Sequence, residues 1–348
     1  MRLILQISSV LQLLISANTQ SSKSITSDHN NENLPKCYQN AYTKGRWIRD
    51  TTLKKSFYCC GWDEFDFRHD PEKCYNNTDY SHANLFLFKG SNDRLAHSGG
   101  HGCACDAKGS RNSTNPREQY TWKPDNCYLE PWNGKKFCDI LGNRTVLIVG
   151  DSTLQQVAVT LINMISTWEG RCADQITFAK SYFLTFKKWG EKKKNIVEYV
   201  EDINPDIVIF SAGAHLHDFG DMYSVMENLR KLFPPMRANV LQNGHKNVSM
   251  VWKTQNPGHV TCDSFKEPQT HYTLAKPEMD NYCWNLHPTF DELSRNYSTI
   301  MNYEVIDMSP LYFRADAHPG FDCLHYCVPG PLDLFSILFL NKLLYGEI

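Results

Sequence analysis

Three side chains in this sequence are of the types that a serine nucleophile requires. Ser152 lies in the tripeptide GDS, and Asp322 and His325 stand three positions apart in the segment FDCLHYCVPGP near the end of the chain. A serine hydroxyl attacks an ester carbonyl when an imidazole takes its proton, and a carboxylate holds that imidazole in the right tautomer. The residue types therefore predict a catalytic triad with Ser152 as nucleophile, His325 as base and Asp322 as the orienting carboxylate.

Each motif also has a simpler interpretation. Asp151 or Ser152 can cap the start of a helix, as aspartate and serine commonly do. Asp322 and His325 can be a neighbouring pair in a turn or short helix, where residues three apart share one face. The two motifs together favour the catalytic interpretation, because each supplies what the other lacks.

The segments around these residues predict strands that alternate with helices. Residues 145–149 (TVLIV) form a continuous apolar run, typical of a strand buried on both faces. The apolar residues after Ser152 follow one face of a helix. Similar patterns predict strands at 206–210, 248–254 and 303–308, and helices at 193–203, 222–233 (ending at Pro234), 289–302 and 331–344. This alternation predicts an α/β fold of three layers, with a parallel sheet between helices.

Small or polar residues follow three of the predicted strands, at the sheet edge where the active groups of parallel sheets gather. Gly150 permits a tight turn before Ser152, where the start of a helix offers backbone N–H groups to a negative charge. Gly213 and Asn256 follow the next two predicted strands. We expect the backbone N–H groups of Ser152 and Gly213 and the amide of Asn256 to hold the oxyanion of the reaction. Taken singly, the glycine and the asparagine can equally be turn residues.

The first residues and the cysteine count predict a protein of the secretory pathway. Residues 1–17 carry one early positive charge and an apolar core, as a cleaved signal peptide does. An uncleaved anchor, which would keep the protein in the Golgi, is the alternative. Thirteen cysteines are many for a reducing compartment, and an odd number leaves at least one free or paired with another chain. Five glycosylation sequons agree with this environment, at Asn76, Asn112, Asn143, Asn247 and Asn296.

Composition divides the remaining chain into three parts. Residues 18–35 are small and polar, which is typical of a disordered linker. Residues 36–143 hold eight of the thirteen cysteines and many turn residues, which predicts an irregular, disulfide-bonded region that packs on the rest of the chain. Residues 144–348 carry the predicted sheet and are expected to form the catalytic domain.

Charge and ligand types argue against several classes of partner. A net charge of −2, from 36 basic and 38 acidic side chains, gives no electrostatic reason to expect nucleic acid. No segment beyond the first residues is apolar enough to predict a membrane span. Residues 59–60 (CC), 101–105 (HGCAC) and 215–217 (HLH) contain metal-ligand types, but cysteines in an oxidising compartment favour disulfides. We therefore expect neither a metal nor a cofactor.

Two blocks near the C-terminus resemble a known family, the PC-esterase and trichome birefringence-like family of the SGNH/GDSL hydrolase superfamily. FRADAHPG (313–320) is similar to the family's Arg-x-Asp-Ala-His-Pro block, and DCLHYCVPG (322–330) to its Asp-Cys-x-His-Trp-Cys-x-Pro-Gly block. Tyr326 stands where the family has tryptophan. The segments CYQNAYTKGRW (37–47) and TWKPDNC (121–127) look like further family blocks, so the resemblance covers about residues 37–344.

The resemblance implies an SGNH-like fold and O-acyl ester chemistry on a carbohydrate, often acetyl transfer through an acyl-serine. The triad residues would keep the roles given above. The alternatives are a secreted O-acetylesterase of the same fold and a non-catalytic glycan-binding protein. Trp122 and Trp132 could stack on a sugar ring, although packing against the disulfides is the preferred interpretation. The candidates for substrate contacts, each of which can equally be structural, are Gln156, His215, Arg314 and His318.

The sequence departs from the family pattern at positions that concern the substrate and the acyl donor. Gln155 and Gln156 stand where plant members have Arg-Asn. Asn256 belongs to an Asn-Pro-Gly-His segment where those members have Ser-Pro-x-His. The spacer between His318 and Asp322 is short. These departures leave the glycan and the acyl donor open.

Overall fold

The structure is a computed structural model, and it describes most of the chain from residue 34 onwards. The chain divides into two compact units, Met1–Leu34 and Pro35–Ile348, and the account below concerns the second unit. The described residues are 34–51, 119–167, 172–185, 194–244, 247–272, 274, 279–318 and 322–348. The expected signal peptide, nearly all of the expected linker, two sequons (Asn76 and Asn112) and the cysteines of residues 59–60 and 101–105 lie outside these residues.

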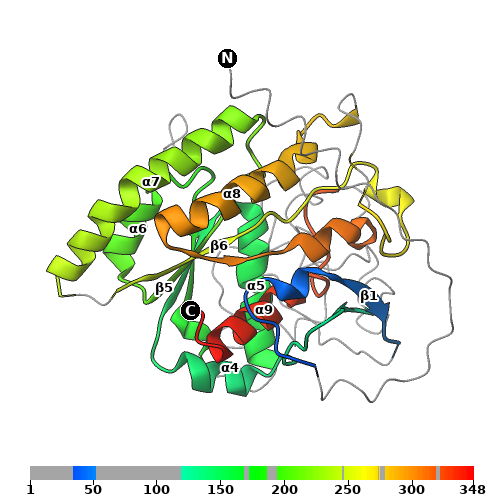
Figure 1. Ribbon diagram of the computed structural model, residues 1–348, viewed down its shortest axis with the longest axis horizontal. Helices are drawn as coiled ribbons and strands as arrows, with labels where there is room; N and C mark the ends of the chain where they lie inside the picture. The colour runs from blue at the N-terminus through cyan, green and yellow to red at the C-terminus, as the bar shows by residue number, and fades with distance from the viewer. Residues whose placement is uncertain are drawn as a thin grey trace, which may run out of the picture. The chain divides into compact units, whose positions relative to one another are not determined.

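A five-stranded parallel sheet lies at the centre of the second unit (Figure 1). Its strands, in spatial order, are β4 (Ile176–Lys180), β3 (Val146–Gly150), β5 (Ile207–Phe210), β6 (Ser249–Lys253) and β7 (Glu304–Ile306). All four neighbouring pairs are parallel. The predicted α/β fold with a parallel sheet is therefore confirmed. The edge strand β4 was not predicted, because it is only partly buried and its sequence ITFAK lacks a continuous apolar run.

Helices cover both faces of the sheet, which gives the three layers of the predicted α/β fold (Figure 1). One face carries α4 (Gly134–Leu141), α5 (Ser152–Thr167) and α9 (Asp333–Leu344). The other face carries α6 (Ile196–Ile203), α7 (Phe219–Gln242) and α8 (His287–Met301). Successive side chains of β3 point to opposite faces, so Ile148 joins the first core and Leu147 the second.

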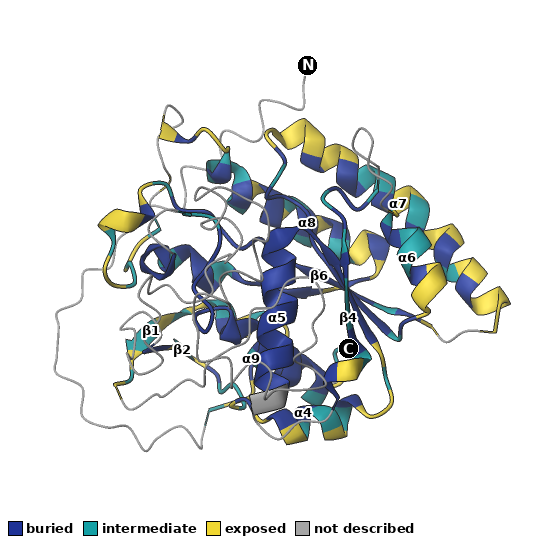
Figure 2. Ribbon diagram, turned by 180° about the vertical axis from the view of Figure 1, so that it is seen from behind, coloured by how far each residue is buried: buried dark blue, intermediate teal, exposed yellow. Residues whose placement is uncertain are grey.

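Helix α5 is buried on every side rather than along one stripe (Figure 2). Residues 152–165 are all buried, between the sheet, α4 and α9. Polar side chains therefore lie inside the protein, among them Gln155, Gln156 and Asn163. Buried polar groups are costly unless they are hydrogen-bonded, so their partners reveal what this helix holds in place.

The end of α7 differs from the sequence prediction. The helix was expected to end at Pro234, but it continues through Pro234 and Pro235 to Gln242. A proline inside a helix costs about 3 kcal/mol. Phe233, Met236 and Val240 continue the buried face of the helix beyond the prolines, and this burial offsets the cost.

The described residues of the predicted cysteine-rich region, 36–51 and 119–143, include regular elements. β1 (Gly45–Arg49) and β2 (Tyr120–Pro124) form an antiparallel pair, and α4 follows. Trp47 donates from Nε1 to the carbonyl of Pro310 at 2.8 Å, and the Tyr42 hydroxyl accepts from the backbone N–H of Asp307 at 2.7 Å. These contacts pack the region against the C-terminal loops. Short 3-10 helices lie at Ala41–Thr43, Ala173–Gln175, Cys262–Ser264, Trp284–Leu286, Ser309–Phe313 and Ala315–Ala317.

The disulfides and the exposed sequons fit the secretory environment that the sequence indicates. Disulfides join Cys37 to Cys127, Cys138 to Cys172 and Cys262 to Cys323. Cys283 is a free thiol, which is one of the two outcomes that the odd count allows. The sequon residues within the described part, Asn143, Asn247 and Asn296, are exposed. Among the described residues, no helix combines the length and the apolar character needed to cross a bilayer.

Candidate active site

A chain of two short hydrogen bonds joins Ser152, His325 and Asp322. Ser152 Oγ lies 2.8 Å from His325 Nε2, although the two residues are 173 positions apart in sequence. His325 Nδ1 lies 2.7 Å from Asp322 Oδ2. Because the carboxylate can only accept, it fixes the proton on Nδ1 and leaves the lone pair of Nε2 facing the serine hydroxyl. This tautomer is the one in which an imidazole can take the proton of a serine.

Ser152 does not cap helix α5, because the residue before it does so. Ser152 is the first residue of α5, and the cap is Asp151, whose Oδ1 accepts from the backbone N–H of Thr153 at 2.9 Å and from its hydroxyl at 2.6 Å. Gly150 has no room for a side chain, since a Cβ would lie 2.6 Å from the side chain of Leu154. The turn therefore leaves the hydroxyl of Ser152 to face His325.

Hydrogen bonds keep Asp322 ionised. Burial acts to raise the pKa of this carboxyl, but hydrogen bonds from the His325 ring and from the backbone N–H groups of His325 and Leu324 outweigh it. The net result is that the pKa of Asp322 lies well below its usual range. The carboxylate is thus charged at any pH at which His325 can act as a base.

Three kinds of contact fasten the loop that carries His325. The Cys262–Cys323 disulfide and a hydrogen bond of 2.8 Å from the backbone N–H of His259 to the Cys323 carbonyl join it to the loop after β6. The amide of Gln156 joins it to α5. Its Nε2 donates to the Tyr326 carbonyl at 2.7 Å, and its Oε1 accepts from the Tyr326 backbone N–H at 3.1 Å. A side-chain amide on α5 therefore pairs with the peptide groups beside the base.

Asn256 lies beside the proposed nucleophile. Its Nδ2 donates to the carbonyl of Thr153 at 3.1 Å, and the side chain is buried. An amide nitrogen has two hydrogens, so this contact leaves one for a bound oxyanion. The Oδ1 atom of Asn256 is buried without a hydrogen-bond partner among the described residues.

Gly213 lies at the carboxyl end of β5 in a conformation that a side chain would not tolerate. Its φ of +154° disfavours other residues, and a Cβ would overlap the amide of Gln255 at 2.3 Å. Gln255 precedes Asn256 and donates to the carbonyl of Ala212 at 2.7 Å. The three oxyanion candidates thus come from neighbouring strands β3, β5 and β6, and their role stays a prediction.

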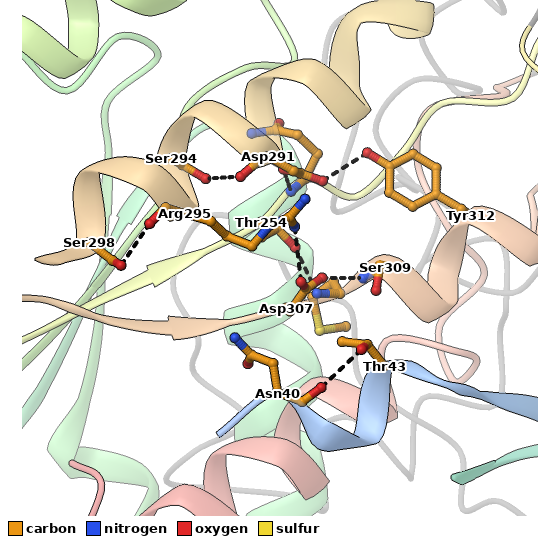
Figure 3. Close-up of polar contacts among 12 residues, drawn as sticks. Asn40, Thr43, Thr254, Asp291, Ser294, Arg295, Ser298, Asp307, Ser309 and Tyr312 are labelled. Carbon is orange, nitrogen blue, oxygen red and sulfur yellow. Dashed lines mark hydrogen bonds and ion pairs between the residues drawn. The ribbon is translucent and has the colours of Figure 1, made fainter. Parts of the chain in front are cut away.

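A buried polar network supports the loop after β6 (Figure 3). Asp291 on α8 accepts from the backbone N–H of Gln255 and from the hydroxyl of Tyr312, both at 2.8 Å, and Figure 3 shows that hydroxyl pointing at the carboxylate. Thr254 Oγ1 accepts from the backbone N–H of Met308 at 2.7 Å. The loop that carries Asn256 is therefore tied to α8 and to the segment after β7.

Lys253 and Asp291 are fully buried ionisable groups behind the same loop. Burial lowers the pKa of Lys253 to about 8, against the charges of Asp291 and Asp151. Burial raises the pKa of Asp291 to about 7, and the charge of Asp307 adds to the effect. Lys253 Nζ donates to the carbonyl of Thr254 at 2.5 Å. These groups hold the loop from behind and do not touch Ser152 or His325.

Three of the four predicted substrate contacts already have partners inside the protein. Arg314 is fully buried and pairs with Asp316 at 2.9 and 3.1 Å. His318 is buried against the carbonyl of His325, and the amide of Gln156 is used on Tyr326. Each of the three satisfies a buried group of the protein, which favours the structural interpretation, and their role as substrate contacts stays a prediction. His215, half-buried and edge-on to Tyr182, stays a prediction.

The structure also assigns partners to residues that carried no predicted role. Tyr326, where the family has tryptophan, directs its hydroxyl to the carbonyls of Pro257 at 2.9 Å and Leu311 at 3.2 Å. His259 contacts His318 and lies beside Tyr326. The sequence signals for His259 were its place in the segment after a predicted strand and its match to the histidine of the family's Ser-Pro-x-His block. Trp122 and Trp132 are buried in the core, as preferred.

A cavity of about 220 Å³ lies next to the loop after β6. His259, Tyr272 and Trp284 are among its lining residues. The ring of Trp284 stacks on Tyr282, with centroids 4.9 Å apart and planes 14° apart, and Tyr282 is 59% exposed. The cavity is thus lined by the buried ring of Trp284, on which the exposed ring of Tyr282 stacks.

Comparison with known proteins finds relatives that carry the same family name. No family model matches the chain. Protein trichome birefringence-like 13 of Arabidopsis thaliana is 23% identical over 373 residues, covering 84% of this chain and 86% of the relative. Protein trichome birefringence-like 39 of the same plant is 21% identical over 65% of this chain and 75% of the relative. The chain is thus similar in sequence to trichome birefringence-like proteins.

A further plant relative and one solved structure complete the comparison. Trichome birefringence-like protein 18 of Arabidopsis thaliana is 20% identical over 64% of this chain and 58% of its own length. The crystal structure of an acetyl xylan esterase, AlAXEase, matches 59% of this chain and 99% of its own at 16% identity. The TM-score of that match is 0.34, too low to carry an argument about fold or activity. The prediction of a catalytic triad therefore rests on the geometry of Ser152, His325 and Asp322 in this chain.

We predict that replacing Gln156 with leucine lowers stability far more than the same change at Gln155. Gln156→Leu leaves the N–H and C=O of Tyr326 buried and unpaired, which costs about 2–4 kcal/mol in the free energy of unfolding. Gln155 is equally buried on α5, but its Oε1 has no partner among the described residues. Gln155→Leu should change the free energy of unfolding by less than about 1 kcal/mol. Urea denaturation measures both, and equal losses contradict the assignment.

Proposed function

We propose that this protein is a serine-dependent O-acyltransferase that moves an acyl group, an acetyl group in the simplest case, onto a carbohydrate. The observation that carries the proposal is the contact of Ser152 Oγ with His325 Nε2 at 2.8 Å, with Asp322 on the other ring nitrogen at 2.7 Å. The kinship with the trichome birefringence-like proteins supports the same site, because the family resemblance assigns it the same residues. Hydrolysis at this site, which would make the protein an esterase, is an outcome of the test.

The proposed reaction has two halves that use the same three side chains. In the first half, Ser152 Oγ attacks the acyl carbonyl of the donor while His325 Nε2 takes the hydroxyl proton. The tetrahedral oxyanion is held by the backbone N–H groups of Ser152 and Gly213 and by the amide of Asn256. Collapse breaks the bond to the donor oxygen, which leaves with the proton from His325, and an acyl-Ser152 ester remains.

In the second half, a sugar hydroxyl replaces the donor. It loses its proton to His325 and attacks the acyl-Ser152 carbonyl, and the ester bond to Ser152 breaks. His325 returns the proton to the Ser152 oxygen. Asp322 stays ionised throughout, because hydrogen bonds from His325 and Leu324 hold its pKa low. Water in place of the sugar hydroxyl would release a free carboxylic acid.

The environment of the chain agrees with a carbohydrate substrate. Disulfides, exposed sequon asparagines and the expected signal segment fit the secretory pathway, where glycans are built and exported. The exposed ring of Tyr282, stacked on the buried Trp284, offers a flat apolar face of the kind that binds sugar rings. We propose that a glycan lies on this face while its hydroxyl reaches acyl-Ser152.

Incubation of the purified protein with candidate glycans and an acetyl donor tests the reaction. We expect the mass of the glycan to rise by one or more acetyl groups, and Ser152→Ala should reduce the rate by about 1,000-fold or more. Free acetate without glycan acetylation identifies an esterase instead. Activity that survives Ser152→Ala at the wild-type rate removes the proposed nucleophile.

The proposed glycan face predicts a separation between binding and chemistry. Tyr282→Ala should raise KM for the glycan by about 10-fold, because the stacking of a sugar ring on an aromatic ring contributes on the order of 1 kcal/mol. The value of kcat should change little. Tyr223→Ala is the matched control, since Tyr223 is 47% exposed and stacks on Phe219 at the N-terminal end of α7. An unchanged KM in Tyr282→Ala, or an equal rise in both variants, contradicts the proposed face.

A further inference from the structure

Two buried histidines beneath the His325 loop make three contacts in a row. His259 Nε2 lies 3.0 Å from the carbonyl oxygen of Tyr312, and His318 Nδ1 lies 2.8 Å from the carbonyl oxygen of His325. The remaining nitrogens, His259 Nδ1 and His318 Nε2, face each other at 2.8 Å. Both residues are almost fully buried, since only 6% of the surface of His259 and 2% of that of His318 is exposed.

The number of protons that these contacts require exceeds what two neutral rings carry. A carbonyl oxygen only accepts, so His259 must donate from Nε2 and His318 must donate from Nδ1. A neutral imidazole has one N–H, so both facing nitrogens would then present lone pairs to each other at hydrogen-bond distance. A metal ion between them would need a separation of roughly 4 Å. Only a third proton satisfies all three contacts.

We propose that His259 and His318 share this third proton and form a singly charged imidazole–imidazolium pair that positions the catalytic His325. The proton comes from solvent, and one N–H bond to it forms on either ring while the other ring accepts. The pair binds no substrate and takes no part in bond making. Its effect on the reaction runs through the carbonyl of His325.

Burial opposes the charge, and the hydrogen bonds favour it. Burial lowers the pKa of His259 to about 4 and that of His318 well below its usual range, so neither ring alone would keep an extra proton. The charge of Arg314 acts against a proton on His259, and His325 acts against one on His318, whereas Asp322 favours it. His287, itself kept neutral by burial, also lies near enough to His259 to interact with it. Two carbonyl oxygens and the shared proton supply three charge-assisted contacts in place of a lone-pair repulsion.

The histidine pair hydrogen-bonds to one end of the peptide unit between His325 and Tyr326, and α5 hydrogen-bonds to the other end. The carbonyl of His325 accepts from His318, and the N–H of the same peptide unit, on Tyr326, donates to Gln156. The ring of His318 also packs on the ring of Tyr326, with centroids 4.2 Å apart. The peptide that follows the base is thus fixed on both sides, which sets the direction of the His325 side chain toward Ser152.

Nitrogen and proton spectra of the histidine rings test the proton count directly. In ¹⁵N-histidine-labelled protein at mildly acidic pH, we expect one strongly downfield, exchange-protected proton that correlates with a nitrogen on each of the two rings. His259→Gln and His318→Gln assign the signal by its loss. In His259→Gln an amide N–H can donate to His318 Nε2, so His318 should become a neutral ring with its proton on Nδ1. If the wild-type spectrum shows both His259 and His318 as neutral rings at mildly acidic and at neutral pH, the proposal is overturned. This result needs only the wild-type protein, so it holds even if a variant does not fold.

Kinetics with a small aryl acetate test the positioning effect. His259→Phe, which can make neither contact, should lower kcat by about 100-fold with little change in KM, whereas His259→Gln should lose less. Equal losses in both variants contradict a positioning role through hydrogen bonding. The kinetic experiment rests on the proposed function, whereas the spectra of the histidine rings do not. If Ser152→Ala keeps full activity the proposed function fails, and the proton count is still decided.

Discussion

The hydrogen bond between Ser152 and His325 joins a helix start in the middle of the chain to a loop near its end, and many of the buried polar groups around it serve this contact. Ser152 is fixed by the turn from β3 into α5, where Asp151 takes the capping role. His325 lies on a loop without regular structure, so the backbone geometry of a helix or strand does not fix the direction of its side chain. The Cys262–Cys323 disulfide and the amide of Gln156 hold the loop and thereby fix that direction.

Burying these polar side chains costs free energy, so they are expected only where the direction of a backbone group must be fixed. A buried amide, imidazole or carboxyl stabilises the fold only when its partners are in place, and its cost is high when one partner is missing. Apart from the Cys262–Cys323 disulfide, three of these buried groups act on backbone groups in the loops that carry His325 and Asn256. His318 acts on the carbonyl of His325, Gln156 on the peptide groups of Tyr326 and Asp291 on the N–H of Gln255. An apolar core would be easier to bury, but it could not set the direction of a peptide unit.

The parallel sheet could be predicted from strong local signals, whereas the proximity of Ser152 and His325 could be predicted only from two motifs that each supply what the other lacks. The run TVLIV and the turn at Gly150 mark a buried strand that leads into a helix, and Asp322 and His325 have the spacing of a hydrogen-bonded pair. The strand β4 was missed because an edge strand is only partly buried. The extension of α7 past Pro234 depends on tertiary burial of Met236 and Val240, which overrides the local preference of proline.

The supporting residues could not be predicted because their roles depend on which backbone group each one meets. Gln156 and His318 were expected to face a substrate, as polar side chains beside a nucleophile often do, but the structure buries both against the His325 loop. Nothing in the sequence indicates that His259 faces His318, since 59 positions separate them. The partners of polar residues inside a protein are set by topology rather than by local pattern.

The most direct test of the account is the reaction of the intact protein with a fluorophosphonate, which labels a serine only when a neighbouring base activates it. Peptide mapping by mass spectrometry should find the label on Ser152, and the rate of labelling should fall by about 100-fold or more in His325→Gln. No label on Ser152 in the folded wild-type protein, or an equal rate in His325→Gln, would contradict the central claim that His325 activates Ser152.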